Sequence, residues 1–406
     1  MNLPSDSGDS RPKRGKLLLM THMLSPRGGG NCVSAWALQA LCEEWDVTLL
    51  CEETPDIDAV NRYYGTWLKK GEFTVRTLPW LKRILGKLDP DPQSIQPLAW
   101  LIRTCQRVGG DFDVIMSVAN EVDTGHQAIQ YTHYPIYAPQ MPTLRKYAGT
   151  SFWFRLKGLI RGEYRPWMII TRSQPDRIEQ NLFLANSHWT ARVIREFYTT
   201  EPKVLYPPVR LAEATLPWTS RQPAFVVLGR LTKIKRQVLA IDLLEQVRER
   251  EHAVDLHIIG DPDPKDQGQY AEDIQQRAQE AGSWVKVHIS VERQELDTIL
   301  ANSRFGLHMM EEEHFGIAIA EMMSFGCIVF VPNGGGQVEI VGQDSGLVFK
   351  NINDAVDRIC NLLDDETLQI ELSERQQSRA QNFGTDQFMA RLQKIVSDSV
   401  FTQQSH

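Results

Sequence analysis

The sequence predicts an α/β protein made of two domains, each built on a doubly wound parallel β-sheet. Short apolar segments, often β-branched, alternate with helical stretches, which is the pattern of buried parallel strands joined by crossover helices. The pattern stops at residues 199–224, a stretch that contains five prolines, and then starts again. The length of 406 residues fits two domains, since one domain takes about 150 residues.

In the first half, apolar segments predict the strands and helical spacing predicts a helix. The expected strands are residues 16–22, 46–51, 73–78, 112–118 and 183–187. A helix is expected over residues 33–41, between the first two strands.

The second half repeats this alternation. Its expected strands are residues 225–230, 255–261, 285–291, 305–310, 327–332 and 346–350. Its expected helices are residues 238–251, 270–282, 295–302, 316–325 and 351–364. Two such domains would face each other across a cleft at the carboxyl ends of their strands, where α/β folds bind ligands.

We therefore expect four segments along the chain. A disordered tail over residues 1–15 precedes a Rossmann-like domain over residues 16–200. A second Rossmann-like domain follows over residues 201–375. Residues 376–406 are expected to form a helical tail that packs back towards the first domain.

The composition excludes several classes of protein. Hydrophobic residues make up 42% and charged residues 23% of the chain, as is usual for a soluble globular protein. No stretch reaches the ~18 uninterrupted apolar residues of a membrane-spanning helix, and the polar N-terminus is not a secretory signal. The six cysteines show no C-x-x-C spacing, so we expect a reduced, cytoplasmic protein without a zinc site.

The net charge of −7 conceals an asymmetry. Residues 1–200 contain 24 Lys and Arg against 20 Asp and Glu, a balance of +4, and the remainder contains 20 against 31, a balance of −11. A basic half indicates an anionic partner, although two solvated domains of different charge explain the numbers equally well. No nucleic acid is expected as a partner, because helix-turn-helix, zinc-finger and RNA-recognition signatures are missing.

Residues 311–326, EEEHFGIAIAEMMSFG, contain the most informative motif. Their apolar positions predict a buried helix that follows a strand and ends at the last glycine. The helix start at Phe315–Ile317 offers free N–H groups, and Gly316 would let a diphosphate approach the backbone closely. Buried carboxylates need partners, so Glu313 and Glu321 would suit sugar or ribose hydroxyls. The alternative is an ordinary helix whose glutamate is satisfied within the protein.

Two loops carry features of phosphate binding. The basic loop over residues 229–236, GRLTKIKR, follows an expected strand, and its Arg230 and Lys235 could bind a diphosphate as a forked donor and a point charge. A solvated surface loop is the alternative. The glycine-rich turn over residues 26–30, PRGGG, lies between a strand and a helix, but the G-x-G-x-x-G dinucleotide pattern is absent.

Three further features are noted, and the second and third have two explanations each. Residues 332–341, PNGGGQVEIV, repeat the order of strand, glycine loop and helix start. His133 in YTHYP ends an expected strand, and it is either a hydrogen-bonded core residue or part of a binding site. Residues 78–88 and 150–167 mix basic with aromatic side chains, which fits either an anionic lipid surface or a core-packed helix with solvated charges.

Taken together, the motifs resemble a known family. Arg230 and Lys235 in G-R-L-x-x-x-K, with Glu313 and Glu321 in E-H-F-G-I-x-x-x-E, resemble the donor-site signature of the retaining family-four glycosyltransferases. Those enzymes have the GT-B fold, in which two Rossmann-like domains face a central cleft. Further stretches that resemble signatures of this family are residues 185–194, 206–209 and 334–341.

A closer likeness is carried by GLHMMEEEHFGI, YTHYP and ANSHWT. These stretches are similar to the α-1,2-mannosyltransferases that extend the dolichol-diphosphate-linked core glycan. The chain differs from those enzymes at MMSFG, where they usually read MAAG, and no membrane helix precedes its first expected strand.

The resemblance implies transfer of a hexose, mannose or glucose, from a GDP- or UDP-hexose to a glycan, a lipid-linked acceptor or a soluble small molecule, with no cofactor. Arg230 and Lys235, with the helix start at Phe315–Ile317, would neutralise the leaving diphosphate in place of a metal ion. Glu321 would hold the ribose hydroxyls, and Glu313 would face the transferred hexose.

For the other domain, the resemblance implies that Gly29 and Gly30 close over the donor and that His133 lines the cleft from the acceptor side. The basic aromatic segments favour peripheral contact with an anionic membrane at its inner face. Two other classes of function stay open. One is a nicotinamide-dependent oxidoreductase, which would require the missing G-x-G-x-x-G loop, and the other is a catalytically silent sugar-nucleotide-binding protein.

Overall fold

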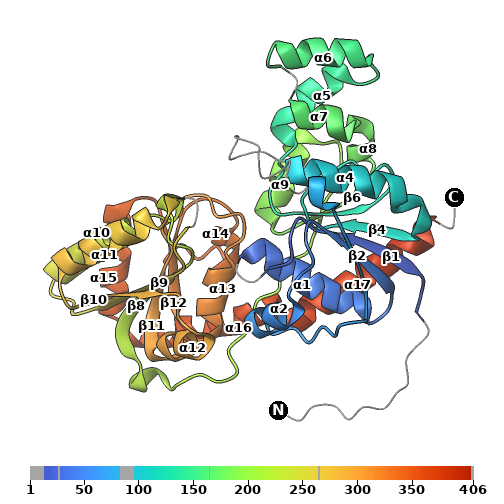
Figure 1. The fold of residues 1–406 in the computed structure, drawn as a ribbon. Helices are drawn as coiled ribbons and strands as arrows, with labels where there is room; N and C mark the ends of the chain where they lie inside the picture. The colour runs from blue at the N-terminus through green and yellow to red at the C-terminus, as the bar shows by residue number, and fades with distance from the viewer. Residues whose placement is uncertain (1–12, 26–27, 83–95, 164, 264–265, 404–406) are drawn as a thin grey trace. The chain divides into compact units, whose positions relative to one another are not determined.

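The computed structural model describes residues 13–25, 28–82, 96–163, 165–263 and 266–403. It contains two parallel β-sheets, one of seven strands and one of six, with helices in the connections between strands (Figure 1). The predicted α/β class, with two Rossmann-like sheets, is confirmed.

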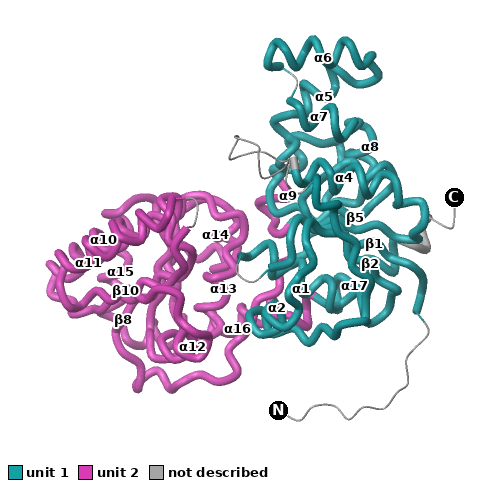
Figure 2. The backbone as a smooth tube through the Cα atoms, in the orientation of Figure 1, with its two compact units in different colours: residues 1–185, 193–205, 389–406 teal, residues 186–192, 206–388 magenta. Residues whose placement is uncertain are grey.

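The chain divides into two compact units (Figure 2). Unit 1 comprises residues 1–185, 193–205 and 389–406, and unit 2 comprises residues 186–192 and 206–388. The chain therefore passes between the units after residues 185, 192, 205 and 388, whereas we expected boundaries after residues 200 and 375. Residues 376–388 stay in unit 2 because α16 (Glu366–Ala380) packs against α13 (Ile317–Ser324).

The sheet of unit 1 has the strand order β3-β2-β1-β4-β5-β6-β7, and every neighbouring pair is parallel. Its strands are β1 (Lys16–Met20), β2 (Asp46–Cys51), β3 (Thr74–Thr77), β4 (Val114–Ser117), β5 (Ile129–Thr132), β6 (Leu182–Ala185) and β7 (Lys203–Val204). Leu17 of β1 is paired with Val47 on one side and Val114 on the other. Since helices cover both faces, the side chains of residues 17–20 are all buried, as their unbroken apolar run indicates.

The described helices of unit 1 are α1 (Gly29–Cys42), α2 (Ile57–Tyr64), α4 (Gln96–Val108), α5 (Met141–Tyr147), α6 (Phe152–Ile160), α7 (Pro166–Thr171), α8 (Pro175–Glu179), α9 (His188–Phe197) and α17 (Thr385–Gln403). Two of them, α9 and α17, begin in unit 2 and continue into unit 1. Helix α1 starts four residues before the predicted Val33, because glycines are poor helix formers and the sequence pattern predicts a loop at Gly29 and Gly30. The C-terminal helix α17 packs on α1, where the Gln393 side chain donates to the Ala40 carbonyl at 2.9 Å.

The sheet of unit 2 has the parallel strand order β10-β9-β8-β11-β12-β13. Its strands are β8 (Gln222–Leu228), β9 (Asp255–Gly260), β10 (Val285–Ile289), β11 (Ser303–Leu307), β12 (Ile328–Pro332) and β13 (Val348–Phe349). Its helices, besides α13 and α16, are α10 (Gln237–Glu249), α11 (Gln269–Ala281), α12 (Arg293–Asn302), α14 (Gln337–Ile340) and α15 (Ile352–Leu363). At the centre of the core, Phe225 of β8 stacks on Phe305 of β11 with ring centroids 4.8 Å apart.

In both sheets the strand order reverses beside the first strand. In unit 2 the chain moves outward from β8 to β9 and β10, and then returns to place β11 on the other side of β8. The connections after β8 and β11 therefore leave the sheet in opposite directions, and open α/β sheets bind their ligands at such a point. In unit 1 the equivalent point lies between β1 and β4.

Two properties of the described residues concern membrane crossing and the state of the cysteines. No helix among them combines the length and the apolar character that crossing a bilayer requires. All six cysteines are free thiols, and five of the six are buried.

Candidate functional site

The loops that carry the predicted site residues of unit 2 lie at the carboxyl edge of its sheet, where the strand order reverses. Loop 229–236 follows β8 and loop 308–316 follows β11, and these two strands are hydrogen-bonded neighbours. Because parallel neighbours end at the same edge, Lys235 and Glu313 meet although 78 residues separate them in the chain.

Lys235, Glu313 and His308 form one cluster at this edge. The Lys235 ammonium forms an ion pair with Glu313 Oε2, and His308 Nε2 lies 3.4 Å from the same oxygen. Burial opposes ionisation of Glu313, but the contacts with His308 and Lys235 outweigh it and hold the pKa of the carboxyl well below its usual range. Burial also lowers the pKa of His308. The cluster is therefore a carboxylate between an ammonium and an imidazole whose burial disfavours its charged form, and His308 is the member that the sequence did not reveal.

Arg230 stands at the start of the same loop. Its carbonyl accepts a hydrogen bond of 2.8 Å from the Gln237 side chain, which fixes the turn into α10. Its side chain is exposed, and within the described parts of the chain the guanidinium forms no ion pair. Its neighbour Arg236 is instead paired with Glu311. Arg230 thus keeps its positive charge available for an anionic ligand.

Helix α13 begins directly after Gly316, whose φ of +109° lies in the left-handed region. This backbone conformation favours glycine, and a Cβ atom here would also lie 2.6 Å from Ile319 Cδ1, which would have to shift. In the first turn of the helix the Ile319 N–H donates to the Gly316 carbonyl at 3.0 Å, so the N–H groups of Ile317 and Ala318 are the ones without an acceptor within the helix. The Phe315 side chain is buried against Tyr206 and Phe383, so Phe315 can offer a ligand its backbone only.

Glu321 has a protein partner that the sequence did not indicate. Its Oε1 forms an ion pair with Arg293, the first residue of α12, and Arg293 also binds Asp297 Oδ1 at 2.5 Å. Burial opposes the charge on Arg293, but Glu321 and Asp297 outweigh it and raise its pKa. The predicted need of Glu321 for a partner is thus met in part by a guanidinium, which also sets the direction of the carboxylate.

The three glycines of residues 334–336 fix the loop that carries Glu313. The Gly336 N–H donates to the Glu313 carbonyl at 2.7 Å, and the Gln337 side chain donates to the Met310 carbonyl at 2.9 Å. A Cβ atom at Gly335 or Gly336 would overlap the carbonyl oxygen of residue 313 or 314. The sequence showed this glycine loop but gave no reason for it. The reason is direct backbone-to-backbone contact, which leaves no room for side chains.

The start of α9 supports the same loop from another direction. Ser187 Oγ donates to the His314 carbonyl at 2.6 Å. The Trp189 indole stacks on the His314 ring, with the ring centroids 5.6 Å apart. The His188 N–H donates to Glu339 Oε1 at 2.8 Å, although burial still raises the pKa of Glu339. Loop 308–316 is therefore held by main-chain contacts on two sides, which preorganises Glu313.

In unit 1, the structure brings Gly30 and His133 together. Gly29 and Gly30 are the first two residues of α1, and a Cβ atom at Gly30 would lie 3.6 Å from His133 Nε2. The His133 N–H donates to Asn120 Oδ1 at 2.7 Å, which fastens the loop after β5 to the end of β4. Asn120 was not predicted. These residues also lie at the carboxyl edge of their sheet, beside its reversal point.

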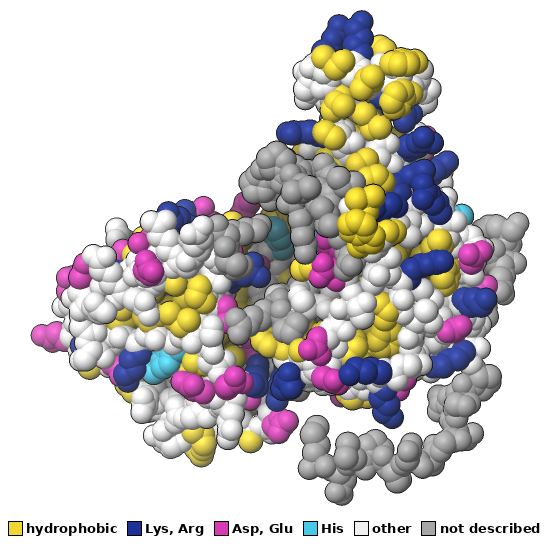
Figure 3. All heavy atoms as spheres, viewed as in Figure 1, with side chains coloured by type: hydrophobic (Ala, Val, Ile, Leu, Met, Phe, Trp, Pro, Cys, Tyr) yellow, Lys and Arg dark blue, Asp and Glu magenta, His cyan; other side chains and the backbone are white. Residues whose placement is uncertain are grey.

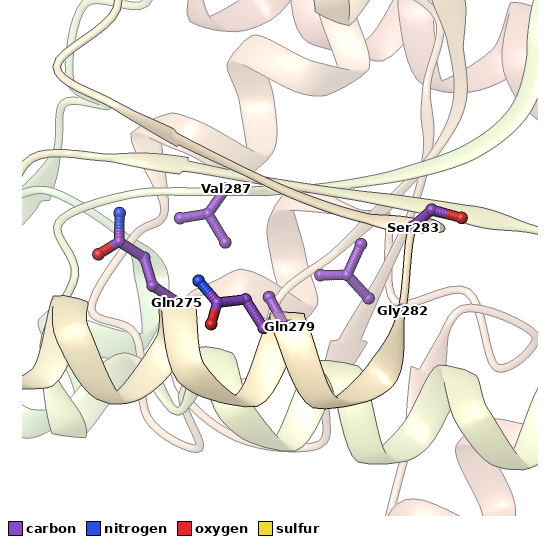
Figure 4. Close-up of a pocket in the computed structure, with 7 residues that line it drawn as sticks. Gln275, Gln279, Gly282, Ser283 and Val287 are labelled. Carbon is purple, nitrogen blue, oxygen red and sulfur yellow. The ribbon is translucent and has the colours of Figure 1, made fainter.

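A surface hollow of about 520 Å³ lies elsewhere in unit 2, between α11 and β10. Gln275 and Gln279 of α11 line it together with Ser283, and none of its lining residues is charged (Figure 4). None of the predicted site residues reaches it. A hollow without charged groups has little to offer a diphosphate, so the candidate site stays at the carboxyl edge.

The positive charge of the candidate site comes from Arg230, Lys235 and the start of α13. In the part of the chain that the structure describes, no group of three or more His, Cys, Asp or Glu side chains is placed to hold a metal ion.

Comparison with known proteins adds a family match. Residues 212–383 match the family model described as Glycosyl transferases group 1. The GDP-Man:Man(3)GlcNAc(2)-PP-Dol alpha-1,2-mannosyltransferase of Mus musculus is 26% identical over 217 residues, 48% of this chain and 44% of that protein. The protein of the same name from Dictyostelium discoideum is 22% identical over 244 residues, 54% of this chain and 48% of that protein. The matches thus span about half the length of these relatives.

Solved structures share the fold over almost the whole chain. HepE of Anabaena in complex with UDP and glucose matches with a TM-score of 0.65 at 16% identity, covering 95% of this chain and 100% of that chain. Sucrose-phosphate synthase from Thermosynechococcus elongatus matches with a TM-score of 0.67 at 15% identity, covering 96% and 100%.

Two Rossmann-like sheets, with a charged cluster at the reversal point of the second, define a protein of the GT-B class. The sequence match agrees with this class. Residues 212–383 match the glycosyl transferases of group 1, and the chain shows distant similarity to the dolichol-linked α-1,2-mannosyltransferases.

Proposed function

We propose that the protein is a retaining, metal-independent glycosyltransferase that moves a hexose, mannose or glucose, from a GDP- or UDP-hexose to an acceptor hydroxyl. The observation that carries this proposal is the preorganised cluster of Lys235 and Glu313 beside the start of α13, in a chain that matches the group 1 family model. The structure of HepE, which has the same fold and was solved in complex with UDP and glucose, supports a nucleotide sugar as the donor.

In the proposed reaction, the bond between the anomeric carbon and the diphosphate oxygen breaks, and the acceptor oxygen bonds to that carbon on the same face. The acceptor proton passes to the departing phosphate, so no side-chain nucleophile is required. Arg230, Lys235 and the N–H groups at Phe315–Ile317 would stabilise the charge that develops on the diphosphate. Glu313 would orient the hexose and stabilise its developing positive charge, and Glu321 would hold the ribose.

The residues of unit 1 complete the proposal. Gly29 and Gly30 leave the start of α1 free of side chains, so a donor could approach its N–H groups. His133, next to Gly30, would line the acceptor side. Asn120 holds the backbone of His133, so we assign Asn120 a positioning role.

We propose a lipid-linked or growing glycan as the acceptor, handled by a cytoplasmic protein that binds the inner face of a membrane peripherally. The names of the curated relatives, which include the dolichol-linked glycan Man(3)GlcNAc(2)-PP-Dol, support this choice. The free thiols fit a reducing compartment. A soluble small-molecule acceptor is the alternative, and it predicts turnover that needs no membrane.

A panel of UDP- and GDP-sugars in a thermal-unfolding assay tests the proposed donor. A ligand at about 100 times its Kd should raise the free energy of unfolding by about 2.7 kcal/mol, so the correct donor stands out from the others. ATP and NAD serve as controls, because the site is expected to discriminate against them. Stabilisation by NAD alone would contradict the proposal, and donor binding without turnover of any acceptor would identify a silent binding protein.

Activity is expected to survive EDTA, because Arg230, Lys235 and the start of α13 supply the positive charge that a metal supplies elsewhere. The measurement is initial rate before and after dialysis against the chelator, with Mg²⁺ and Mn²⁺ added back. Mild stimulation by a divalent ion is compatible with faster product release. Complete loss of turnover in EDTA, restored by either metal, would overturn metal independence.

A further inference from the structure

Helix α6 of unit 1 exposes its apolar side chains instead of burying them. Phe152 is 57%, Trp153 74%, Phe154 47% and Ile160 81% exposed. The sequence left open whether residues 150–167 form a core-packed helix, and these exposures show that α6 is not packed in that way. Figure 3 shows yellow apolar and dark blue basic side chains gathered over this end of unit 1.

The apolar stripe points away from the body of unit 1. At about 100° per residue, positions 152, 153, 156 and 160 share one face of the helix, and position 158 lies opposite. Gly158 is buried, and a Cβ atom there would overlap the Tyr147 hydroxyl. The face that rests on the protein is therefore the glycine face. The orientation is the reverse of that of an ordinary surface helix.

The helix is held in this orientation by its neighbours. Ser151 caps its start by accepting from the Phe154 N–H at 3.4 Å. The Tyr147 hydroxyl donates to Glu163 Oε2 at 3.0 Å, and Lys146 forms an ion pair with the same carboxylate. The bonds on both sides of α6 favour a fixed surface over a freely moving arm.

Charge identifies the partner. Residues 145–165 contain six basic residues and one acidic residue, a balance of +5. The single acidic residue, Glu163, forms an ion pair with Lys146 and accepts a hydrogen bond from the Tyr147 hydroxyl. Lys157, Arg161 and Arg165 are exposed, and none of them forms an ion pair with the residues that the structure describes. Positive charge beside exposed Trp and Phe is the composition of surfaces that rest in the head-group region of anionic bilayers.

We propose that α6 is a bilayer-docking element whose Phe152, Trp153 and Ile160 enter the head-group region of an anionic membrane. Lys157 and Arg161 bind the lipid phosphates beside them. The inference concerns a surface outside the sugar-transfer site, so it does not rest on the chemistry proposed above. The other basic aromatic segment, residues 78–88, is described only to Lys82, whose ammonium lies 4.9 Å from the Trp100 ring centroid.

Sedimentation of the full chain with phosphatidylcholine vesicles, with and without phosphatidylglycerol, tests the proposal. Binding is expected to the anionic vesicles and to be weak to the neutral ones. It should weaken with salt, because the Debye length falls from about 10 Å at 0.1 M to about 3 Å at 1 M. Equal binding to both kinds of vesicle, or none to either, would overturn the proposal. Binding of an acidic protein in place of vesicles would also overturn it.

Matched variants assign the binding to α6. Trp153→Ser with Ile160→Ser should weaken vesicle binding at least about tenfold, since two large apolar side chains leave the bilayer. Lys157→Ala with Arg161→Ala should cost about fivefold for each charge. The controls lie in unit 2: Leu368→Ser removes a side chain that is 39% exposed, and Lys286→Ala removes an exposed cation. Equal losses in the controls, or none in the α6 variants, would refute the assignment.

Two further readouts separate docking from folding and from catalysis. Since the replaced side chains are exposed, melting temperature and nucleotide-sugar binding should be unchanged in the α6 variants. Brominated lipids should quench the fluorescence of Trp153, measured as the difference between the wild-type chain, with ten tryptophans, and Trp153→Phe. Quenching that is identical in both would show that Trp153 stays outside the bilayer. Donor binding without vesicle binding would overturn the docking proposal, and with it the peripheral membrane binding proposed above, but it would leave the proposed sugar transfer unaffected.

Discussion

Arg230→Ala is expected to lower kcat by about 10²–10³, and Lys235→Ala by a similar factor, because each removes one preorganised positive group. In the proposed site, that group would face the oxygen on which the diphosphate gains charge as its bond to the sugar breaks. Arg230 is the cleaner test, since its exposed guanidinium forms no ion pair with the described residues. The melting temperature of Arg230→Ala should therefore be that of the wild-type chain, and kcat for the preferred donor is the quantity to measure.

Lys235→Ala needs a folding control, because it leaves the carboxylate of Glu313 without its ammonium partner. Lys235→Arg keeps the charge and should recover part of the lost rate. Lys233→Ala is the matched control, since Lys233 is exposed on the same loop and is not assigned to the site. Wild-type turnover in Arg230→Ala or Lys235→Ala would remove that residue from the proposed site.

Glu313→Gln is expected to lower kcat by about 10²–10³ while binding of the free nucleotide persists. The amide has the shape of the carboxylate but lacks the charge that would stabilise the positive charge on the transferred hexose. Burial opposes ionisation of this carboxyl, but His308 and Lys235 hold its pKa well below the usual range. Glu313 thus stays ionised in mildly acidic solution, and the acid limb of the pH–rate profile should belong to another group.

The neighbouring Glu312 supplies the control for this variant. Its side chain is exposed on the same loop, and it is not assigned to the site, so Glu312→Gln should keep the wild-type rate. Kinetics with donor varied and nucleotide-binding measurements on both variants separate loss of chemistry from loss of binding. Parallel loss of nucleotide affinity and rate in Glu313→Gln would mean that Glu313 serves the nucleotide and not the sugar.

The fold was predictable because buried parallel strands are unbroken apolar runs, and those runs need no tertiary information. Strands such as Lys16–Met20 and Ile328–Pro332 were found within two residues of their expected ends. Glycines produced the main local error, since Gly29 and Gly30 are helical in the structure. The boundary between the units was missed because α9 is one continuous helix, so no break in periodicity marks the change after residue 192.

In the candidate site, the sequence indicated the residues that stand in recognisable motifs. It missed the residues whose importance comes only from the side chain or backbone that they contact in the folded protein. The ion pair of Lys235 with Glu313 confirms that the two motifs meet, although the roles assigned to these residues stay predictions. Arg293 and Asn120 carry no motif, and they matter only because the fold places them beside Glu321 and His133. His308 directly follows β11 and is buried, and no motif marks it, so the sequence gave no indication of its role.

Because the chain crosses between the two units four times, the position of the junction matters when domains are exchanged between related proteins. The seam that the prolines suggest, at the start of the second domain, leaves residues 186–192 on the wrong side of the cut. A chimera joined there would combine the Ser187 and His188 of one parent with the His314 and Glu339 of another. Exchange of the second half between relatives should therefore carry two segments, residues 186–192 and 206–388, as one module.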